Sequence, residues 1–159
     1  MSPRRPVREK QTENKDFRLL LLSLYSIPNL RLLWMGTLSE ELREALFRSA
    51  QTDSFVAKRR YEREVVNLMR EEDEAGLTFL QQLLDDTDRF QKQYDSALEE
   101  HAQKLVEPEE LAVFLEEHPN VDIQILRQRL RNHAQKNSDK TKELLYDVLA
   151  PLLFPLDWR

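Results

Sequence analysis

The chain has 159 residues and no cysteine, which suits one domain or two small subdomains and excludes disulfides, thiolate metal sites and cysteine nucleophiles. It has two glycines, little valine or isoleucine and no useful stretch of alternating apolar and polar residues, which argues against strands and excludes a glycine-rich phosphate loop. The formal net charge of −5 conceals basic segments, and no run of about 20 apolar residues exists that could span a bilayer.

Apolar periodicity and capping residues predict an all-α, multihelical protein with two small helical subdomains joined by a long helix. Residues 1–15 are polar and basic and contain prolines, so we expect them to form a flexible basic tail. The predicted helices cover about residues 16–25, 29–35, 39–51, 53–72, 74–105, 108–118, 122–137 and 138–150.

The longest predicted helix, residues 74–105, carries apolar residues at steps of three and four, which is typical of a coiled-coil-like seam. The seam consists of Leu80, Leu83, Thr87, Phe90, Tyr94, Ala97, His101 and Leu105. We expect residues 16–106 to form an N-terminal subdomain that includes this helix. Residues 107–159 are expected to form a C-terminal subdomain whose last helix ends at Pro151 and is followed by an extended apolar tail.

Two predicted helices are basic although the chain is acidic. Residues 53–70 hold five basic and three acidic residues, and residues 122–142 hold six and two, whereas residues 71–117 hold three and fifteen. Arginine suits phosphate because its planar fork donates two bonds and stays charged. The candidate RNA-binding residues are Lys58, Arg59, Arg60, Arg63, Arg70, Arg127, Arg131 and Lys136.

A helical wheel separates each basic stripe from a buried one. In the first helix the buried side is predicted to hold Tyr61, Val65, Leu68 and Met69. In the second it is predicted to hold Ile123, Leu126, Leu130 and Ala134, with Arg129, His133 and Lys136 together on one flank. Two alternatives remain open: solvated faces on which Glu62 and Glu64 pair locally with the basic residues, and faces that bind a partner protein.

Catalysis finds no support in the sequence. The three histidines have no second His, Asp or Glu at a recognised metal-ligand spacing, and His101 is better explained as a seam residue. The acidic clusters at 71–74 and 85–88 lack the loop glycine of a calcium site and are better explained as a helix junction and a solvated face. We therefore expect no catalytic residue, no metal, no cofactor and no small-molecule substrate.

The segment LSEELREALFRSAQTDSFVAKRRYEREVVNLMREED (38–73) resembles the YjgA-like ribosome-associated proteins, or dual-action ribosomal maturation proteins. In that family a helix of the form LPxELREAL precedes a triple-basic helix that ends in LMR. Lys58, Arg59 and Arg60 match the triple-basic run, although Val66 and Asn67 stand where the family has Gly-Lys. A second family segment, P-x-x-D-x-x-x-L-R-x-L-x-R-N, is similar to HPNVDIQILRQRLRNHAQKN (118–137).

This resemblance implies an all-helical fold and a non-enzymatic, cytoplasmic assembly factor. The implied partner is the precursor of the large ribosomal subunit, both its rRNA and its ribosomal proteins, and the implied role is to aid maturation of the peptidyl-transferase region. The alternative is a helical adaptor or self-associating scaffold that binds protein through its seam and its apolar tail, which includes Phe154 and Trp158. Neither hypothesis involves a membrane.

Overall fold

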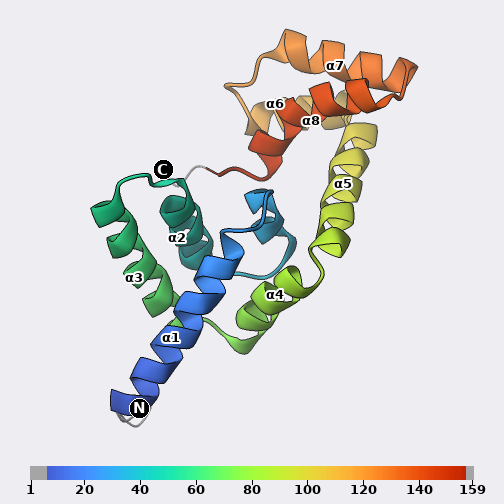
Figure 1. Cartoon of the computed structure of the whole chain (residues 1–159). Coiled ribbons are helices and arrows are strands. Elements are labelled where there is room, and N and C mark those ends of the chain that lie inside the picture. Colours follow the sequence, from blue (N-terminus) through green and yellow to red (C-terminus); the bar gives the residue numbers. More distant parts are fainter. Residues whose placement is uncertain (1–6, 157–159) are drawn as a thin grey trace. The chain divides into compact units, whose positions relative to one another are not determined.

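The computed structural model describes residues 7–156, and in this range the chain is helical without any strand, which confirms the all-α, multihelical class (Figure 1). The elements are α1 (Val7–Leu24), the 3₁₀ helix η1 (Leu30–Met35), α2 (Glu40–Gln51), α3 (Phe55–Glu71), α4 (Glu74–Asp85), α5 (Thr87–Lys104), α6 (Pro108–Glu117), α7 (Ile123–Gln135) and α8 (Asp139–Leu153). No helix in this range is long and apolar enough to cross a membrane.

The prediction of one continuous helix over residues 74–105 is wrong, because Asp86 divides this segment into α4 and α5. Asp86 adopts φ −145° and ψ 62°, and its side chain accepts a hydrogen bond from the backbone N–H of Arg89 at 3.3 Å. Thr87 Oγ1 donates to the carbonyl of Leu83 at 2.8 Å. Short polar side chains compete with the helix for backbone groups, so the sequence Asp-Asp-Thr-Asp ends one helix and begins the next.

Two other helix bounds differ from the predicted ones by three residues or more. Helix α1 begins at Val7, whereas the sequence places its start at Asp16. Helix α8 continues through Pro151 to Leu153, although we expected it to end at that proline. Proline removes one backbone donor, but the chain still closes a final helical bond from the N–H of Phe154 to the carbonyl of Ala150 at 2.8 Å.

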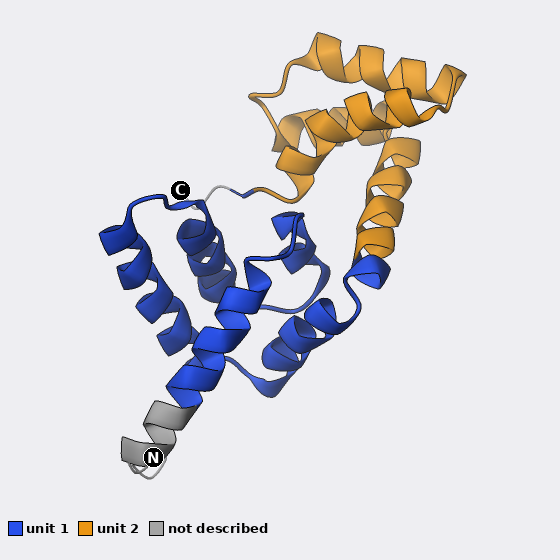
Figure 2. Ribbon diagram, in the orientation of Figure 1, with its two compact units in different colours: residues 1–90, 156–159 blue, residues 91–155 orange. Residues whose placement is uncertain are grey.

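Unit 1 comprises residues 1–90 and 156–159 (Figure 2). Helix α3 packs against both α1 and α2, and α1 also packs against α4. The largest fully buried side chains of this unit are Leu21, Leu32, Leu42, Phe47, Val65, Met69, Leu80 and Leu83. Glu72 connects the end of α3 to the start of α2, because its Oε2 accepts from the backbone N–H and the hydroxyl of Ser39, at 3.1 and 2.8 Å.

Unit 2 comprises residues 91–155 and is built around the pair α7 and α8. Ser138 begins α8 with a capping box, in which Ser138 and Thr141 each bond the other's backbone N–H. The core of this unit consists of Tyr94, Leu98, Ala102, Leu105, Phe114, Leu126, Leu130, Leu145, Leu149 and Ala150. The subdomain boundary predicted between residues 106 and 107 falls inside this unit and stays a prediction.

The predicted seam is correct for its large residues, including Leu105, but between Tyr94 and Leu105 the buried positions shift by one. Leu80, Leu83, Phe90 and Tyr94 are buried, as expected. Beyond Tyr94 the buried positions are Leu98, Ala102 and Leu105, whereas Ala97 and His101 are only half-buried. The buried face therefore continues from Tyr94 by a step of four residues, to Leu98, where the sequence pattern suggested a step of three, to Ala97. The reason is that the larger Leu98 removes more apolar surface from water than Ala97.

Gly36 provides the first test of the fold. Its backbone is extended, with φ −135° and ψ −177°, so any residue could adopt it, but an added Cβ would lie 2.2 Å from Cδ1 of Phe79. Phe79 is buried and its ring meets Phe90 edge-on at 5.5 Å between centroids, so it cannot easily move. We expect Gly36→Ala to lower the free energy of unfolding by about 1–3 kcal/mol in denaturant titration.

Gly76→Ala is the control for this prediction. There the added Cβ meets only the side chain of Glu72, which can move away at the cost of its bonds to Ser39, and alanine favours the helix by about 1 kcal/mol over glycine. We expect Gly76→Ala to lower the free energy of unfolding by clearly less than Gly36→Ala. Equal stability of the Gly36→Ala variant and the parent would show that Phe79 does not occupy this position.

Candidate nucleic-acid interface

Helix α3 presents its basic residues to solvent because its apolar residues are used for packing. The side chain of Ser54 accepts from the backbone N–H of Ala57 and so caps the helix start. Val65, Val66 and Met69 are buried, and this orientation exposes three of the predicted residues, Arg59, Arg60 and Arg63. Tyr61 and Leu68, which the wheel placed on the buried side, are half-buried.

Two glutamates of α3 pair with arginines of other helices. Glu62 Oε2 lies 3.9 Å from Arg18 Nε of α1, and Glu64 Oε2 lies 3.3 Å from Arg48 Nη1 of α2. The local pairing that the sequence left open is therefore absent from the described residues. Among these residues, no carboxylate lies within 4.0 Å of the three exposed arginines of α3.

Lys58 and Arg70 are less available than the other predicted residues of α3. Lys58 is half-buried, with its Nζ 4.7 Å from the ring centroid of Tyr25. Arg70 is also half-buried. Its Nη1 donates to Asn67 Oδ1 at 3.4 Å, and its Nη2 donates to Asn14 Oδ1 of α1. Arg70 thus connects two carboxamides in the structure, a role that its position in the sequence does not reveal.

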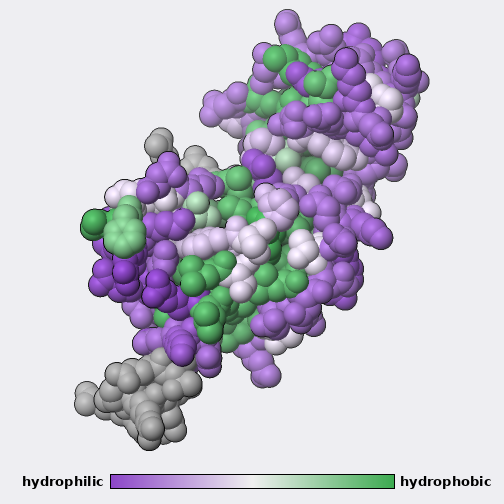
Figure 3. All heavy atoms as spheres, in the orientation of Figure 1, coloured by the Kyte–Doolittle hydropathy of each residue, from purple (hydrophilic) through white to green (hydrophobic). Residues whose placement is uncertain are grey.

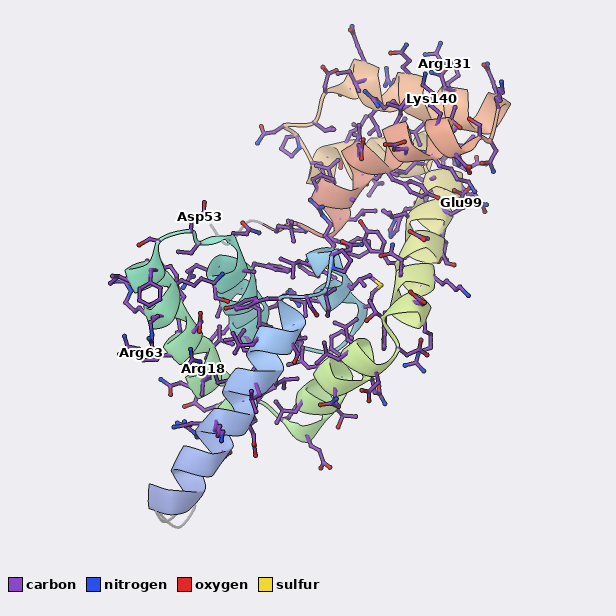
Figure 4. The ribbon with its side chains drawn as sticks, viewed as in Figure 1. Arg18, Asp53, Arg63, Glu99, Arg131 and Lys140 are labelled. Atoms are coloured by element: carbon purple, nitrogen blue, oxygen red, sulfur yellow. The ribbon has the colours of Figure 1, made fainter. Side chains whose placement is uncertain are left out.

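A cleft of about 520 Å³ lies between α1 and α3. Its lining residues are Asn14, Arg18, Arg59, Glu62, Arg63, Val66 and Asn67. Figure 4 labels Arg18 on α1 and Arg63 on α3, the two helices that form its walls. The structure therefore brings Arg59 and Arg63 together with Arg18, which sequence reasoning missed because nothing in the pattern of α1 indicates its neighbour.

An exposed aromatic residue was also missed at the start of α3. Phe55 is 72% exposed, and the guanidinium carbon of Arg59 lies 5.7 Å from its ring centroid. Neighbouring Val56 is 78% exposed. A bare aromatic ring beside arginines is typical of surfaces on which unpaired bases stack. The signal in the sequence was the apolar pair after Ser54, which only Ala57 separates from the triple-basic run.

Helix α7 is rotated relative to the predicted wheel. Leu126, Leu130 and His133 are buried, while Ile123 is 43% exposed and Ala134 is exposed. The predictions that Ile123 and Ala134 are buried and that His133 lies on a basic flank are therefore wrong. The reason is a polar partner, Glu99 of α5, which allows the histidine to enter the core in place of an apolar side chain.

Arg127 and Arg131 line a groove of about 740 Å³ between α6 and α7. Its other lining residues are mostly apolar: Leu105, Val106, Pro108, Leu111, Ala112, Leu115, Leu130, Ala134 and Gln135. Hydrophobic side chains also reach the surface of this unit over α7 (Figure 3). Among the described residues neither arginine has an ion-pair partner. Lys136, at the C-terminal end of α7, is exposed and lines neither the groove nor the cleft.

His133 is buried and belongs to a partly buried polar network. Its Nε2 lies 3.0 Å from both carboxylate oxygens of Glu99, and the hydroxyl of Tyr146 donates to Glu99 Oε2 at 2.5 Å. Burial alone would raise the pKa of Glu99. The bonds from Tyr146 and His133 and the charge of Lys142 outweigh that effect, so the pKa of Glu99 is lowered from 4.5. Burial and the adjacent Glu99 raise the pKa of Tyr146.

The lowered pKa of Glu99 predicts how stability depends on pH. A carboxylate whose pKa is lower in the folded than in the unfolded protein stabilises the fold above the unfolded value, and this stabilisation is lost as pH falls through the folded value. We expect Glu99→Gln to be less stable than the parent at pH 7, and to lose less stability than the parent between pH 7 and acid pH. Denaturant titrations at both pH values, with exposed Glu100→Gln as control, measure this. An unchanged pH dependence in Glu99→Gln would contradict the network.

The described residues contain no group of three or more His, Cys, Asp or Glu side chains that could hold a metal ion. The cleft of unit 1 offers a ligand exposed arginines and amide donors, and the groove of unit 2 offers arginines and apolar surface.

No curated protein and no solved structure matches the chain significantly. The model of one family, the dual-action ribosomal maturation protein DarP, matches residues 8–150. Both basic helices lie inside this range, as do the cleft and the groove. Since the match covers most of the chain, the protein belongs to the dual-action ribosomal maturation protein family, whose members are ribosome maturation factors.

Proposed function

We propose that the protein is a non-enzymatic assembly factor that binds immature large ribosomal subunits in the cytoplasm and aids maturation of their peptidyl-transferase region. Membership of the family supports a role in ribosome maturation. The single observation that supports RNA contact is the pairing of charges on α3. Because Glu62 and Glu64 pair with Arg18 and Arg48, three arginines of α3 keep their charge available for a partner.

The proposed contacts combine phosphate binding with base stacking. Arg59, Arg60 and Arg63 would neutralise phosphates, which supplies affinity and makes binding depend on salt. Phe55, which is exposed next to Arg59, would stack on an unpaired base, because single-stranded RNA is recognised through such rings. In unit 2, Arg127 and Arg131 are proposed as a second contact, and Lys136 as a third.

Sedimentation of the tagged full-length chain with ribosomal particles tests this function. We expect co-migration with precursors of the large subunit, and weaker association with mature particles, at moderate salt. Migration at the top of the gradient only, under conditions where the precursors are intact, would contradict the proposal. Nuclease treatment of the bound fraction should release the protein if RNA supplies the contacts.

The apolar groove favours a second candidate function, docking of a protein partner. Apolar grooves between two helices accept amphipathic helices, and the unpaired Arg127 and Arg131 on its lining favour a helix with acidic flanks. This candidate function corresponds to the adaptor hypothesis, except that the proposed binding surface is formed by α6 and α7 and not by the apolar tail. Trp158, which the sequence placed in that tail, lies outside the described residues.

A further inference from the structure

We propose that the cleft between α1 and α3 is a phosphate-binding site for RNA, in which Arg18, Arg59 and Arg63 supply the charge and Asn14 and Asn67 supply amide N–H donors. This inference rests on the proposed function, and it assigns the contact to a particular cleft and adds residues of α1. The chemical group recognised is a phosphate, and the RNA backbone is its expected source.

The charge of the cleft is the first argument. Three arginines and one glutamate line it, which leaves two positive charges in excess. Because Glu62 pairs with Arg18, the excess charge is that of Arg59 and Arg63. The pair is 3.9 Å apart, beyond ordinary hydrogen-bond length, and the Arg18 side chain remains 52% exposed, so its guanidinium can still contact a ligand. Arg63 Nε donates to the backbone carbonyl of Arg59 at 3.4 Å, which orients the guanidinium and leaves its two terminal nitrogens for a ligand.

The orientation of the two carboxamides is the second, independent argument. Arg70 donates to the Oδ1 atoms of both Asn14 and Asn67, which come from different helices and both line the cleft. With both oxygens held by one guanidinium, each amide has its Nδ2 hydrogens left as donors. Arg70 is therefore a positioning residue in this site, and the lining offers donors from five side chains and an acceptor carboxylate from Glu62 alone.

Such a set of donors selects for an anion with several oxygens. Phosphate accepts charge-assisted hydrogen bonds from arginine forks, and it also accepts from neutral amides. A volume of about 520 Å³ exceeds that of one phosphate group, which leaves room for the adjoining sugar. Val66 at the wall is consistent with contact to the apolar edge of a ribose.

The experiment follows the side-chain amide signals of Asn14 and Asn67 by NMR in the full-length chain. The two probes are inorganic phosphate and a single-stranded oligoribonucleotide of about ten nucleotides. We expect both amide signals to shift with the oligoribonucleotide. A shift with inorganic phosphate as well shows that the phosphate group suffices, whereas a shift with RNA alone shows that the cleft requires a phosphodiester. A shift with inorganic phosphate alone, or with neither probe, would overturn the proposal.

Three variants sharpen this experiment. Arg18→Gln should weaken oligoribonucleotide binding roughly tenfold and reduce its salt slope by about one unit, while Arg89→Gln, an exposed arginine away from the cleft, should change neither by as much. Glu62→Gln should strengthen binding. Arg70→Lys keeps its charge but loses the fork, so we expect the salt slope to be retained and the amide response to be lost.

The failure of this inference can be told apart from failure of the proposed function. If the amide signals respond to RNA but the chain does not sediment with large-subunit precursors, the cleft stands and the ribosomal role falls. If the chain sediments with the precursors and Arg18→Gln binds RNA as the parent does, with the same salt slope, the ribosomal role stands and the cleft assignment falls.

Discussion

Leu98→Asp is expected to lower the free energy of unfolding by about 3–5 kcal/mol, the largest stability effect that we predict for a single residue. Leu98 is 1% exposed on α5, between Tyr94 and Ala102, which are also buried. The substitution removes apolar burial and puts a carboxylate where it has no partner, and each change is costly. Since whole domains are stable by only about 5–15 kcal/mol, this loss should remove a large share of the stability of the fold.

Denaturant titration followed by circular dichroism measures this effect. Gln93→Asp is the matched control, because it introduces the same side chain at an exposed position of the same helix and should cost less than about 1 kcal/mol. Ala97→Asp distinguishes the observed register from the one predicted from the sequence. If Ala97→Asp proves as damaging as Leu98→Asp, or if Leu98→Asp melts like the parent, the register of α5 is wrong.

Four helix starts could be predicted from the sequence, because their signal is local, whereas the start of α1 was missed by nine residues. Asn29, Ser39, Asp122 and Ser138 were each identified as the start of a helix, and in each case the side chain accepts from a backbone N–H two or three residues ahead. Asp86 uses the same chemistry, but it lies inside a long apolar periodicity. The apolar periodicity predicts one continuous helix across Asp86, whereas the polar run at residues 85–88 is the signal that the helix ends there.

The faces of the helices were less predictable, because they depend on partners far away in the sequence. His133 is buried because Glu99, 34 residues earlier, accepts its hydrogen bond. A helical wheel counts histidine as polar and places Ala134 inside instead. In α3 the wheel placed Val65 and Met69 correctly, and its other two positions, Tyr61 and Leu68, are half-buried, but it did not identify Val66, which is buried.

The candidate site shows the same limit. The basic residues of α3 and α7 could be identified from composition and spacing alone. Which of these residues are available to a partner could not be predicted. It depends on the pairing of Arg18 and Arg48 with glutamates of α3, and on the bond between Arg70 and Asn14, which lie 56 residues apart in the sequence. Val66 and Asn67, which replace the Gly-Lys of the family, both line the cleft.

Replacing Arg59, Arg63, Arg127 and Arg131 together by glutamine is expected to abolish association with immature large subunits at physiological salt. All four are exposed and have no ion-pair partner among the described residues, so the fold should keep its stability. Each lost phosphate contact reduces the slope of log K against log salt by about 0.9 for duplex DNA and about 0.7 for single strands, and we apply these values to RNA. The four together should flatten the slope by roughly three units.

Gradient sedimentation at two salt concentrations measures this, with an unfolding curve to show that the variant is folded. Removing the charges of Arg89, Lys92 and Lys104, which are exposed on α5, is the control for general loss of positive charge and should have a much smaller effect. Glu116→Gln with Glu117→Gln on α6 removes repulsion toward phosphate, so binding should stay unchanged or become slightly stronger.

The two pairs of arginines separate the RNA-binding function from the docking of a protein. If only the pair on α7 matters, and its effect is insensitive to salt and survives nuclease treatment, then the groove binds a protein helix and α3 is a solvated face. If the pair on α3 matters and shows the salt dependence of phosphate contacts, α3 binds RNA whatever the groove does. A quadruple variant that co-migrates with large-subunit precursors at the salt tolerance of the parent would remove all four arginines from the interface, because four lost phosphate contacts cannot leave the salt dependence unchanged.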